Sequence, residues 1–413
     1  MEVVICGGGI AGLTAALTFH GAGFKVRVFE AKENRQTTTS AIALAPSGVK
    51  ILFDLGMGPA ILEKSLPLRY LRMFNSQGDL LADVKTAGKE QYGNDSLAMT
   101  RRVLHNVLTS RVESMGIAVR YKAKVSLVEQ SETRVKVFFE DGSSAEADIL
   151  IGADGIHSKV RQSLFPELSV EKKDRGYSGC GVLAPLKLLS PEEQNELKLA
   201  DGAFNTIKGP NGFVGFVGIG KPEDDGEPKF MFWTHIADEL VDDDFDPKDL
   251  AIVKKVLLKL RAGWCRPIEK VIQMIDQSLP GVEVVCGPIT SLWPIPAWSK
   301  SRVVLIGDAA HGYGPGGQGA ALAMEDAQFL ALLLKGKENQ ADQLSGVFQE
   351  FEKKRRVRVE RIGDASEARN TSRLGEQGWM KSKIQEYAMM LMHWWYKNGY
   401  YNADYAYKVE DDM

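Results

Sequence analysis

The sequence predicts an α/β fold in which separated stretches of chain build one core and a β-rich domain is inserted between about Leu168 and Val285. Three observations predict this fold. A strand, a glycine-rich turn, a helix and a second strand open the chain. A strand, turn and helix return near residue 150 and again after Arg302, and strands dominate the stretch between. Insertions of this kind create a cleft between domains, where ligands bind.

The composition of the 413 residues is that of an ordinary globular protein, with 44% hydrophobic and 25% charged residues. A formal net charge of −3 argues against a nucleic-acid-binding protein, which needs a marked basic excess. No apolar run reaches the roughly 18–20 residues of a membrane-spanning helix, and the first strand begins at Glu2. We therefore expect no transmembrane segment, no signal peptide and a cytoplasmic location. The scattered cysteines favour reduced thiols over a disulfide framework or a zinc site; they are Cys6, Cys180, Cys265 and Cys286.

The opening elements form a βαβ unit around a glycine motif. Glu2 to Cys6 predicts a strand, Ile10 to His20 a helix and Lys25 to Glu30 a second strand. The turn from Gly7 to Gly12 fits the G-x-G-x-x-G pattern of Rossmann-like dinucleotide-binding domains, and Glu30 follows its last glycine by 18 residues, near the expected spacing. The sequence therefore predicts a dinucleotide site at the start of the first helix.

The three glycines that define this motif each have a physical role. Gly7 permits a tight turn, Gly9 lets the backbone approach a pyrophosphate without a Cβ, and Gly12 lets the helix pack closely on the sheet. The N–H groups and the dipole at the helix N-terminus stabilise phosphate charge. We expect Glu30 to accept hydrogen bonds from ribose hydroxyls, and its charge disfavours a 2′-phosphate in this pocket.

Further elements follow from periodicity and turn signals. Apolar residues at helical spacing predict helices over residues 47–55, 100–116, 250–260 and 342–369. Alternation predicts hairpins with turns at Gly78-Asp79 and Asp141-Gly142, and strands of the inserted domain over 180–186, 213–219 and 229–236. We expect the amphipathic tail stretch Ile384 to Tyr396 to pack against the core rather than on a membrane or a second copy.

Two later motifs narrow the choice of dinucleotide. Asp148 to Arg161 (DILIGADGIHSKVR) predicts a strand, a tight turn and a helix start. Gly307 to Gly319 (GDAAHGYGPGGQG) follows a strand and precedes a helix. With the opening motif, these resemble the class A flavoprotein monooxygenases, the para-hydroxybenzoate and salicylate hydroxylase superfamily, over nearly the whole chain.

This resemblance implies an α/β protein with a Rossmann-like FAD-binding core, an inserted β-rich substrate domain and a helical C-terminal tail. The FAD-binding domain would comprise residues 1–70, 98–167 and 286–370. The substrate domain would comprise residues 71–97 and 168–285, and the C-terminal helical segment residues 371–413.

The resemblance also carries cofactor roles over by position. Arg101 would reach the FAD pyrophosphate or ribityl chain, Asp154 and Gly155 would contact FAD and serve nicotinamide access, and Asp308 would bind ribityl or ribose hydroxyls. The loop ending at Gly319 would lie against the isoalloxazine. The residues expected to bind FAD are Gly7, Gly9, Ala11, Gly12, Glu30, Arg101, Asp154, Gly155, Asp308, Pro315, Gly317, Gly319 and Ala320.

The residues of the last motif support this interpretation independently. A glycine-rich loop at a helix N-terminus is an anion site. Reduced flavin carries negative charge at N1 and the C2 oxygen, so backbone N–H groups there would favour its reduction.

Two positions depart from the family pattern: no glycine occurs between Thr39 and Ala41, and the family's Leu-x-Pro-Asn is Leu44-Ala45-Pro46-Ser47 here.

The resemblance implies a single-component monooxygenase in which NAD(P)H is the cosubstrate that reduces FAD. The reduced flavin would form a C4a-hydroperoxide with O₂ and transfer one oxygen to a small aromatic or heteroaromatic substrate, secondary metabolites included. Tyr177, His235 and Tyr313 are the candidates for a catalytic base or hydrogen-bonding group. Arg175 could pair with an acidic substrate, although a surface role is favoured.

Other chemistries remain open at this point. The same fold would serve an epoxidase, a Baeyer–Villiger enzyme or an oxidase, and a non-enzymatic escort protein is the least favoured reading. We expect His157, His311 and Glu325 to have structural rather than chemical roles.

Overall fold

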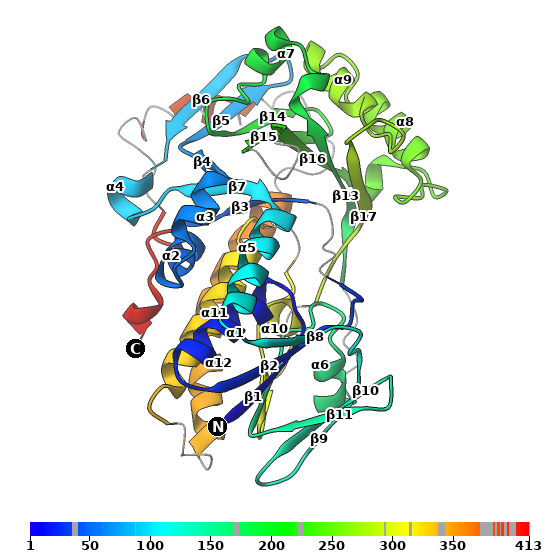
Figure 1. Ribbon diagram of the computed structural model, residues 1–413. Coiled ribbons are helices and arrows are strands. Elements are labelled where there is room, and N and C mark those ends of the chain that lie inside the picture. Colours follow the sequence, from blue (N-terminus) through cyan, green and yellow to red (C-terminus); the bar gives the residue numbers. More distant parts are fainter. Residues whose placement is uncertain are drawn as a thin grey trace.

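A six-stranded sheet lies in one half of the computed structural model, the lower half in Figure 1. The strand order is β18-β19-β12-β1-β2-β8, and all neighbours are parallel except β18 and β19. These strands come from distant stretches of chain, so separated segments build one core, as the sequence predicts. Their bounds are β1 (Glu2–Cys6), β2 (Lys25–Phe29), β8 (Ala118–Arg120), β12 (Ile149–Gly152), β18 (Ser299–Lys300) and β19 (Val303–Leu305).

The structure describes residues 1–34, 40–86, 88–167, 173–220, 227–292, 295–313, 316–337, 343–371, 383–384, 386–388, 390–391, 395 and 402–412. The positions Thr39, Leu168, Pro315 and Tyr396, which the sequence analysis names, lie outside these residues.

Helices pack beside this sheet, around α1 (Ile10–Gly21). Helix α1 contacts α5 (Arg101–Ser114) and α11 (Gly319–Leu334), and α11 also contacts α2 (Pro46–Asp54) and α12 (Leu344–Thr371). Figure 1 shows α1, α11 and α12 lying together next to β1 and β2. The remaining elements of this half are α3 (Gly58–Glu63), α4 (Gly88–Tyr92), α6 (Lys159–Leu164), α10 (Asp308–His311), η4 (Val409–Asp412) and the sheet of β9 (Val125–Gln130), β10 (Val135–Phe139) and β11 (Ser144–Ala147).

A seven-stranded sheet forms the other half, in the order β17-β13-β16-β15-β14-β5-β6. Its neighbours are antiparallel except β14 and β5, which are parallel. The bounds are β5 (Tyr70–Asn75), β6 (Leu80–Lys85), β13 (Lys173–Pro185), β14 (Ala203–Gly209), β15 (Gly212–Ile219), β16 (Lys229–Ala237) and β17 (Glu283–Ser291). Two short 3₁₀ helices described in this half are η1 (Leu186–Leu188) and η2 (Asp238–Leu240).

The two faces of the seven-stranded sheet have different neighbours. Side chains such as Phe216 and Phe232 form one apolar cluster with residues of α8 (Leu250–Leu260) and α9 (Arg266–Gln273), near α7 (Pro191–Glu196). Alternate side chains on the opposite face form a cluster with the small sheet β3-β7-β4. That small sheet comprises β3 (Ala41–Leu44), β4 (Leu66–Leu68) and β7 (Ser96–Thr100). The second face is therefore the one that meets the rest of the molecule.

The cysteine prediction was wrong for one pair. Cys180 of β13 and Cys286 of β17 stand opposite each other in the antiparallel ladder and are joined as a disulfide. Cys6 and Cys265 are free. The pairing depends on strand register across a sequence separation of 106 residues, which residue spacing alone does not reveal.

The prediction for the C-terminal tail was also wrong where the structure describes it. The described residues between 383 and 395 are helical, so the tail is helical as expected. Ile384, Tyr387, Leu391 and Trp395 are nevertheless 62–74% exposed, so these side chains do not enter the core. Within the described part of the chain, none of the helices has the length and apolar character needed to cross a bilayer.

Candidate active site

The turns after β1, β12 and β19 carry the three sequence motifs. These strands are neighbours in the parallel part of the six-stranded sheet. Because the carboxyl ends of parallel strands lie at the same edge, the turns beginning at Gly7, Ala153 and Gly307 converge there. The would-be Cβ of Gly7 lies 2.2 Å from the carbonyl oxygen of Ala153, and that of Gly307 lies 3.1 Å from the Ala11 Cβ. The sheet thus assembles three distant motifs into one edge.

The first turn requires glycine at two positions. Gly7 has φ of +112°, and a Cβ on Gly12 would lie 1.9 Å from the Gly7 carbonyl oxygen. Around Gly9, by contrast, a Cβ would meet no heavy atom within 4 Å. The turn is therefore tight against the sheet and open on the side of Gly9, at the N-terminus of α1, where an anionic group can approach the backbone.

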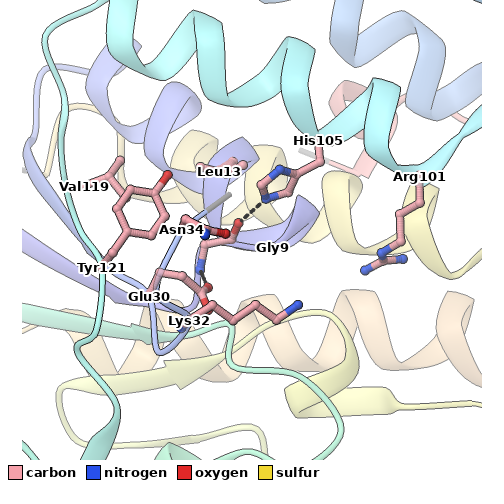
Figure 2. Close-up of a pocket in the computed structure, with 10 residues that line it drawn as sticks. Gly9, Leu13, Glu30, Lys32, Asn34, Arg101, His105, Val119 and Tyr121 are labelled. Carbon is pink, nitrogen blue, oxygen red and sulfur yellow. Dashed lines mark hydrogen bonds between the residues drawn. The ribbon is translucent and has the colours of Figure 1, made fainter. Parts of the chain in front are cut away.

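A pocket of about 100 Å³ lies beside this open side (Figure 2). The Glu30 carboxylate accepts hydrogen bonds from the backbone N–H groups of Gly8 (2.6 Å) and Lys32 (2.8 Å). These bonds hold Glu30 at the pocket wall, and its carboxylate retains further lone pairs for hydroxyl groups. The lining residues are Gly8, Gly9, Leu13, Glu30, Lys32, Asn34, Arg101, His105, Val119 and Tyr121.

Helix α5 supplies Arg101 and His105 to the same pocket. Thr100 caps this helix by accepting a hydrogen bond from the Val103 N–H (3.1 Å). Figure 2 shows the Arg101 side chain extending from the start of α5. The His105 Nε2 lies 2.8 Å from the Gly8 carbonyl oxygen, and burial lowers the pKa of His105. A neutral imidazole that donates to this carbonyl fits both observations. Sequence reasoning missed His105, although it follows Arg101 by one helical turn.

The second turn uses its aspartate as a helix cap. The Asp154 carboxylate accepts hydrogen bonds from the Ser158 hydroxyl (2.5 Å) and from the backbone N–H groups of Lys159 (2.7 Å) and Val160 (3.1 Å). Burial raises the pKa of Asp154, while these bonds oppose the rise. The next residue, Gly155, has φ of +78° and open space around its would-be Cβ. The bonds described for the Asp154 side chain thus go to residues at the start of α6, and the turn leaves open space at the Gly155 backbone.

The third turn combines buried and exposed residues. Asp308 is exposed, whereas Ala309, Ala310 and His311 are buried behind it. Further along, a Cβ on Gly317 or Gly319 would meet no heavy atom within 4 Å, and Ala320 lies in the first turn of α11. The exposed carboxylate and the open glycine backbone therefore lie at the same edge as the pocket beside Gly9.

The structure brings together two of the three candidate catalytic residues. The rings of Tyr177 and His235 have centroids 4.8 Å apart, and the Phe213 ring packs edge-on to His235 at 5.1 Å. Tyr313 is elsewhere: its ring lies 2.2 Å from the would-be Cβ of Gly363 on α12, and burial raises its pKa.

Arg175 does not have the surface position that we favoured. Its side chain is 10% exposed and forms an ion pair with Glu367 of α12. His311 and Glu325 have the structural contacts that we expected, since His311 contacts Asp326 and Glu325 pairs with buried arginines. His157 is exposed, and its structural role stays a prediction.

Aromatic side chains cover the face of the seven-stranded sheet that meets β3. Trp233 and Phe204 have ring centroids 4.8 Å apart, and the Met231 sulfur accepts a hydrogen bond from the Ala41 N–H at 3.3 Å. A Cβ on Gly215 would lie 2.1 Å from the Trp233 indole, so the indole lies directly on this glycine. Trp233 and His235 alternate along β16 and therefore share this face.

Comparison with known proteins decides the family. A family model described as an FAD binding domain matches residues 1–207 and 295–366. The chain belongs to the class A FAD-dependent monooxygenases. It is accordingly a flavoprotein monooxygenase with FAD as cofactor and NAD(P)H as cosubstrate, as the motifs predict.

Named relatives align with most of the length of this monooxygenase. An FAD-dependent urate hydroxylase of Klebsiella oxytoca is 29% identical over 87% of this chain and 87% of its own length. A 6-hydroxynicotinate 3-monooxygenase of Pseudomonas fluorescens is 29% identical over 81% of this chain and 82% of its own. The crystal structure of Klebsiella pneumoniae HpxO complexed with FAD and uric acid has a TM-score of 0.77 at 24% identity, covering 95% of this chain and 93% of that one.

Proposed function

We propose that this monooxygenase hydroxylates a small, planar heteroaromatic compound bound between the third motif turn and the face carrying Trp233. The observation that supports this most directly is the aromatic wall of Trp233 and Phe204, with the indole seated on Gly215. Flat aromatic surfaces favour flat aromatic ligands, because aromatic rings prefer offset-stacked or edge-to-face contact. The named substrates of the two sequence relatives, urate and 6-hydroxynicotinate, are planar heterocycles and agree with this proposal.

The residues at the sheet edge fit FAD. We propose that the α1 N-terminus and Arg101 hold its pyrophosphate, since both supply positive potential beside the open space at Gly9. Glu30 would accept hydrogen bonds from the adenosine ribose, and Asp308 from hydroxyls nearer the ring. Gly317, Gly319 and Ala320 would present backbone N–H groups to the reduced ring. The second turn would contribute backbone at Gly155 rather than the side chain of Asp154.

Bound FAD supplies hydride acceptance from NAD(P)H and, once reduced, the activation of O₂ for insertion of one oxygen atom. The protein's own part is to orient the substrate and to exclude water from the reacting atoms. We propose that the Tyr177 and His235 pair binds the polar edge of the heterocycle and holds a proton at the Tyr177 hydroxyl or an imidazole nitrogen. Tyr313, which packs on α12, is not part of this proposal.

Two domains would meet at this site. We propose that residues 1–70, 98–167 and 286–370 form the FAD-binding domain, and that residues 71–97 and 168–285 form the substrate domain. The strands of the six- and seven-stranded sheets support this division, because each sheet draws its strands from one of the two sets apart from β5 and β17, which cross their boundaries by one and six residues.

A substrate panel tests the proposal. Purified protein loaded with FAD is assayed for NADH and NADPH oxidation with urate, 6-hydroxynicotinate, other hydroxylated pyridines and simple phenols, under ¹⁸O₂. We expect a heterocycle to stimulate oxidation at least tenfold and one ¹⁸O atom to enter the product. Stimulated NAD(P)H oxidation without label in the product would mean that the electrons of NAD(P)H reduce O₂ to peroxide without oxygen transfer, and would contradict hydroxylation of that compound. No response to any heterocycle, together with a response to the simple phenols, would refute the proposed heteroaromatic substrate class.

A further inference from the structure

A buried carboxylate lies directly behind the third motif turn. Asp326 on α11 has no exposed surface. Its Oδ2 accepts a hydrogen bond from the Gly307 N–H (2.9 Å) and lies 2.6 Å from His311 Nε2. Gly307 immediately precedes the short helix α10, which begins with Asp308 and ends with His311. One oxygen of Asp326 thus contacts both ends of the segment that presents the exposed Asp308.

The other oxygen of Asp326 is held from the opposite direction. Asp326 Oδ1 accepts a hydrogen bond from Arg355 Nε of α12 (2.8 Å), and Arg355 is itself fully buried. Burial alone would raise the pKa of Asp326, but His311 and Arg355 lower it to about 2. The side chain is therefore an anion whose two oxygens are both engaged, and it has little freedom to rotate.

The Gly307 backbone has little freedom of its own. It adopts φ of +58° and ψ of −143°, and the Cβ atoms of Ala11 and Ala323 lie 3.1 Å from its would-be Cβ. The direction of its N–H group is therefore defined by close packing on two sides and by Asp326 in front. Any change at Asp326 is transmitted to the peptide that leads into Asp308.

We propose that Asp326 is a positioning residue for FAD, which fixes the Gly307–Asp308 turn so that the Asp308 carboxylate meets the cofactor. The inference rests on the cofactor role proposed above for Asp308. Asp326 does not touch the cofactor; it acts through the backbone of the turn.

The neighbouring residue provides a matched control. Glu325 is equally buried and accepts a hydrogen bond from the same arginine, Arg355 (2.9 Å), and from Arg358 (2.8 Å). None of the bonds described for Glu325 reaches Gly307 or His311. Asp326→Asn and Glu325→Gln therefore both remove a buried negative charge beside Arg355, but only the first disturbs the turn. An amide has one acceptor oxygen, so the side chain introduced by Asp326→Asn cannot accept from donors on both sides.

The test compares FAD affinity with stability in the full-length chain. Apoprotein of each variant is titrated with FAD by flavin fluorescence, and the melting temperature of each apoprotein is measured in parallel. We expect both variants to melt at lower temperature. We expect the Kd for FAD to rise at least tenfold in Asp326→Asn and less than threefold in Glu325→Gln, and the absorbance spectrum of bound flavin to change only in Asp326→Asn.

Two outcomes would overturn the inference: a wild-type Kd in Asp326→Asn, or an equal rise in both variants. If Asp326→Asn does not fold, His311→Ala takes its place. This substitution removes one of the two contacts between Asp326 and the third motif turn, and leaves the Asp326 carboxylate paired with Arg355. A wild-type Kd for FAD in that variant would overturn the inference as well. The variant Asp308→Ala is measured beside them, and an unchanged Kd there would instead refute the proposed role of Asp308.

Discussion

At the level of single residues, the most direct constraint on the substrate face is the contact between Gly215 and Trp233. A Cβ at position 215 would lie 2.1 Å from the indole, closer than real Cβ contacts allow, so Gly215→Ala must displace the ring. We expect the KM for the aromatic substrate to rise about tenfold, a loss of about 1.4 kcal/mol, with FAD affinity unchanged. Steady-state kinetics and flavin titration measure both quantities.

A glycine of the same sheet serves as the control for this substitution. A Cβ on Gly287 of β17 would meet no heavy atom within 4 Å. Gly287→Ala should therefore leave KM within twofold of wild type. An equal rise in KM for both variants would mean that the indole on Gly215 does not shape the substrate site.

His105, which lines the pocket, makes the stability of the folded protein depend on pH in a defined direction. Burial lowers the pKa of His105 below its ordinary value of 6.5. The unfolded chain therefore takes up a proton at higher pH than the folded chain does. The stability contribution is fully present above pH 6.5 and is lost as pH falls from 6.5 through the lower folded-state pKa. Urea denaturation at intervals between pH 8 and pH 5 should show this loss, and His105→Gln should show a smaller one. Equal pH profiles would refute the assignment of a neutral buried imidazole.

At the level of elements, the cap of α5 links helix stability to the pocket. Thr100 accepts the Val103 N–H, and Arg101 and His105 follow it on the first turns of the helix. Thr100→Ala should lower the free energy of unfolding by about 1 kcal/mol and weaken FAD binding. Thr100→Ser retains the hydroxyl and should preserve most of both. Denaturant unfolding and flavin titration provide the measurements, and an FAD affinity that is unchanged in Thr100→Ala would show that the cap does not position Arg101.

Local sequence patterns predicted elements whose structure depends on residues close in sequence. The βαβ opening, α8 and the hairpin turn at Gly142 follow from periodicity and turn residues. Strand pairing depends on distant residues instead. The parallel pairing of β5 with β14 and the register that joins Cys180 to Cys286 have no local signal. The motifs likewise predicted Glu30 and Asp308, but His105 faces the pocket only because α5 packs beside α1.

At the level of the whole molecule, the C-terminal residues 402–412 contact the helices behind the third motif turn. Asp404 forms ion pairs with Arg358 and Arg361 of α12, and the Arg358 guanidinium lies 3.8 Å from the centre of the Tyr407 ring. Arg358 also pairs with Glu325 on α11. The C-terminal residues therefore complete a charged cluster that runs through α12 and α11 toward the third motif turn.

Removing one member of this charged cluster should lower the free energy of unfolding by more than removing a surface ion pair of the same C-terminal residues. Asp404→Asn leaves the buried Arg358 with one charged partner fewer, and we expect the free energy of unfolding to fall by about 1.5–3 kcal/mol. Glu410 pairs with Lys50 at 3.0 Å, but both side chains are partly exposed, so Glu410→Gln should lower the free energy of unfolding by less than about 1 kcal/mol. Urea denaturation of both holoproteins distinguishes the two values. A loss of under 1 kcal/mol for Asp404→Asn would mean that the C-terminal residues only rest on the surface, whereas the larger loss would make residues 402–412 part of the structure that supports the third motif turn.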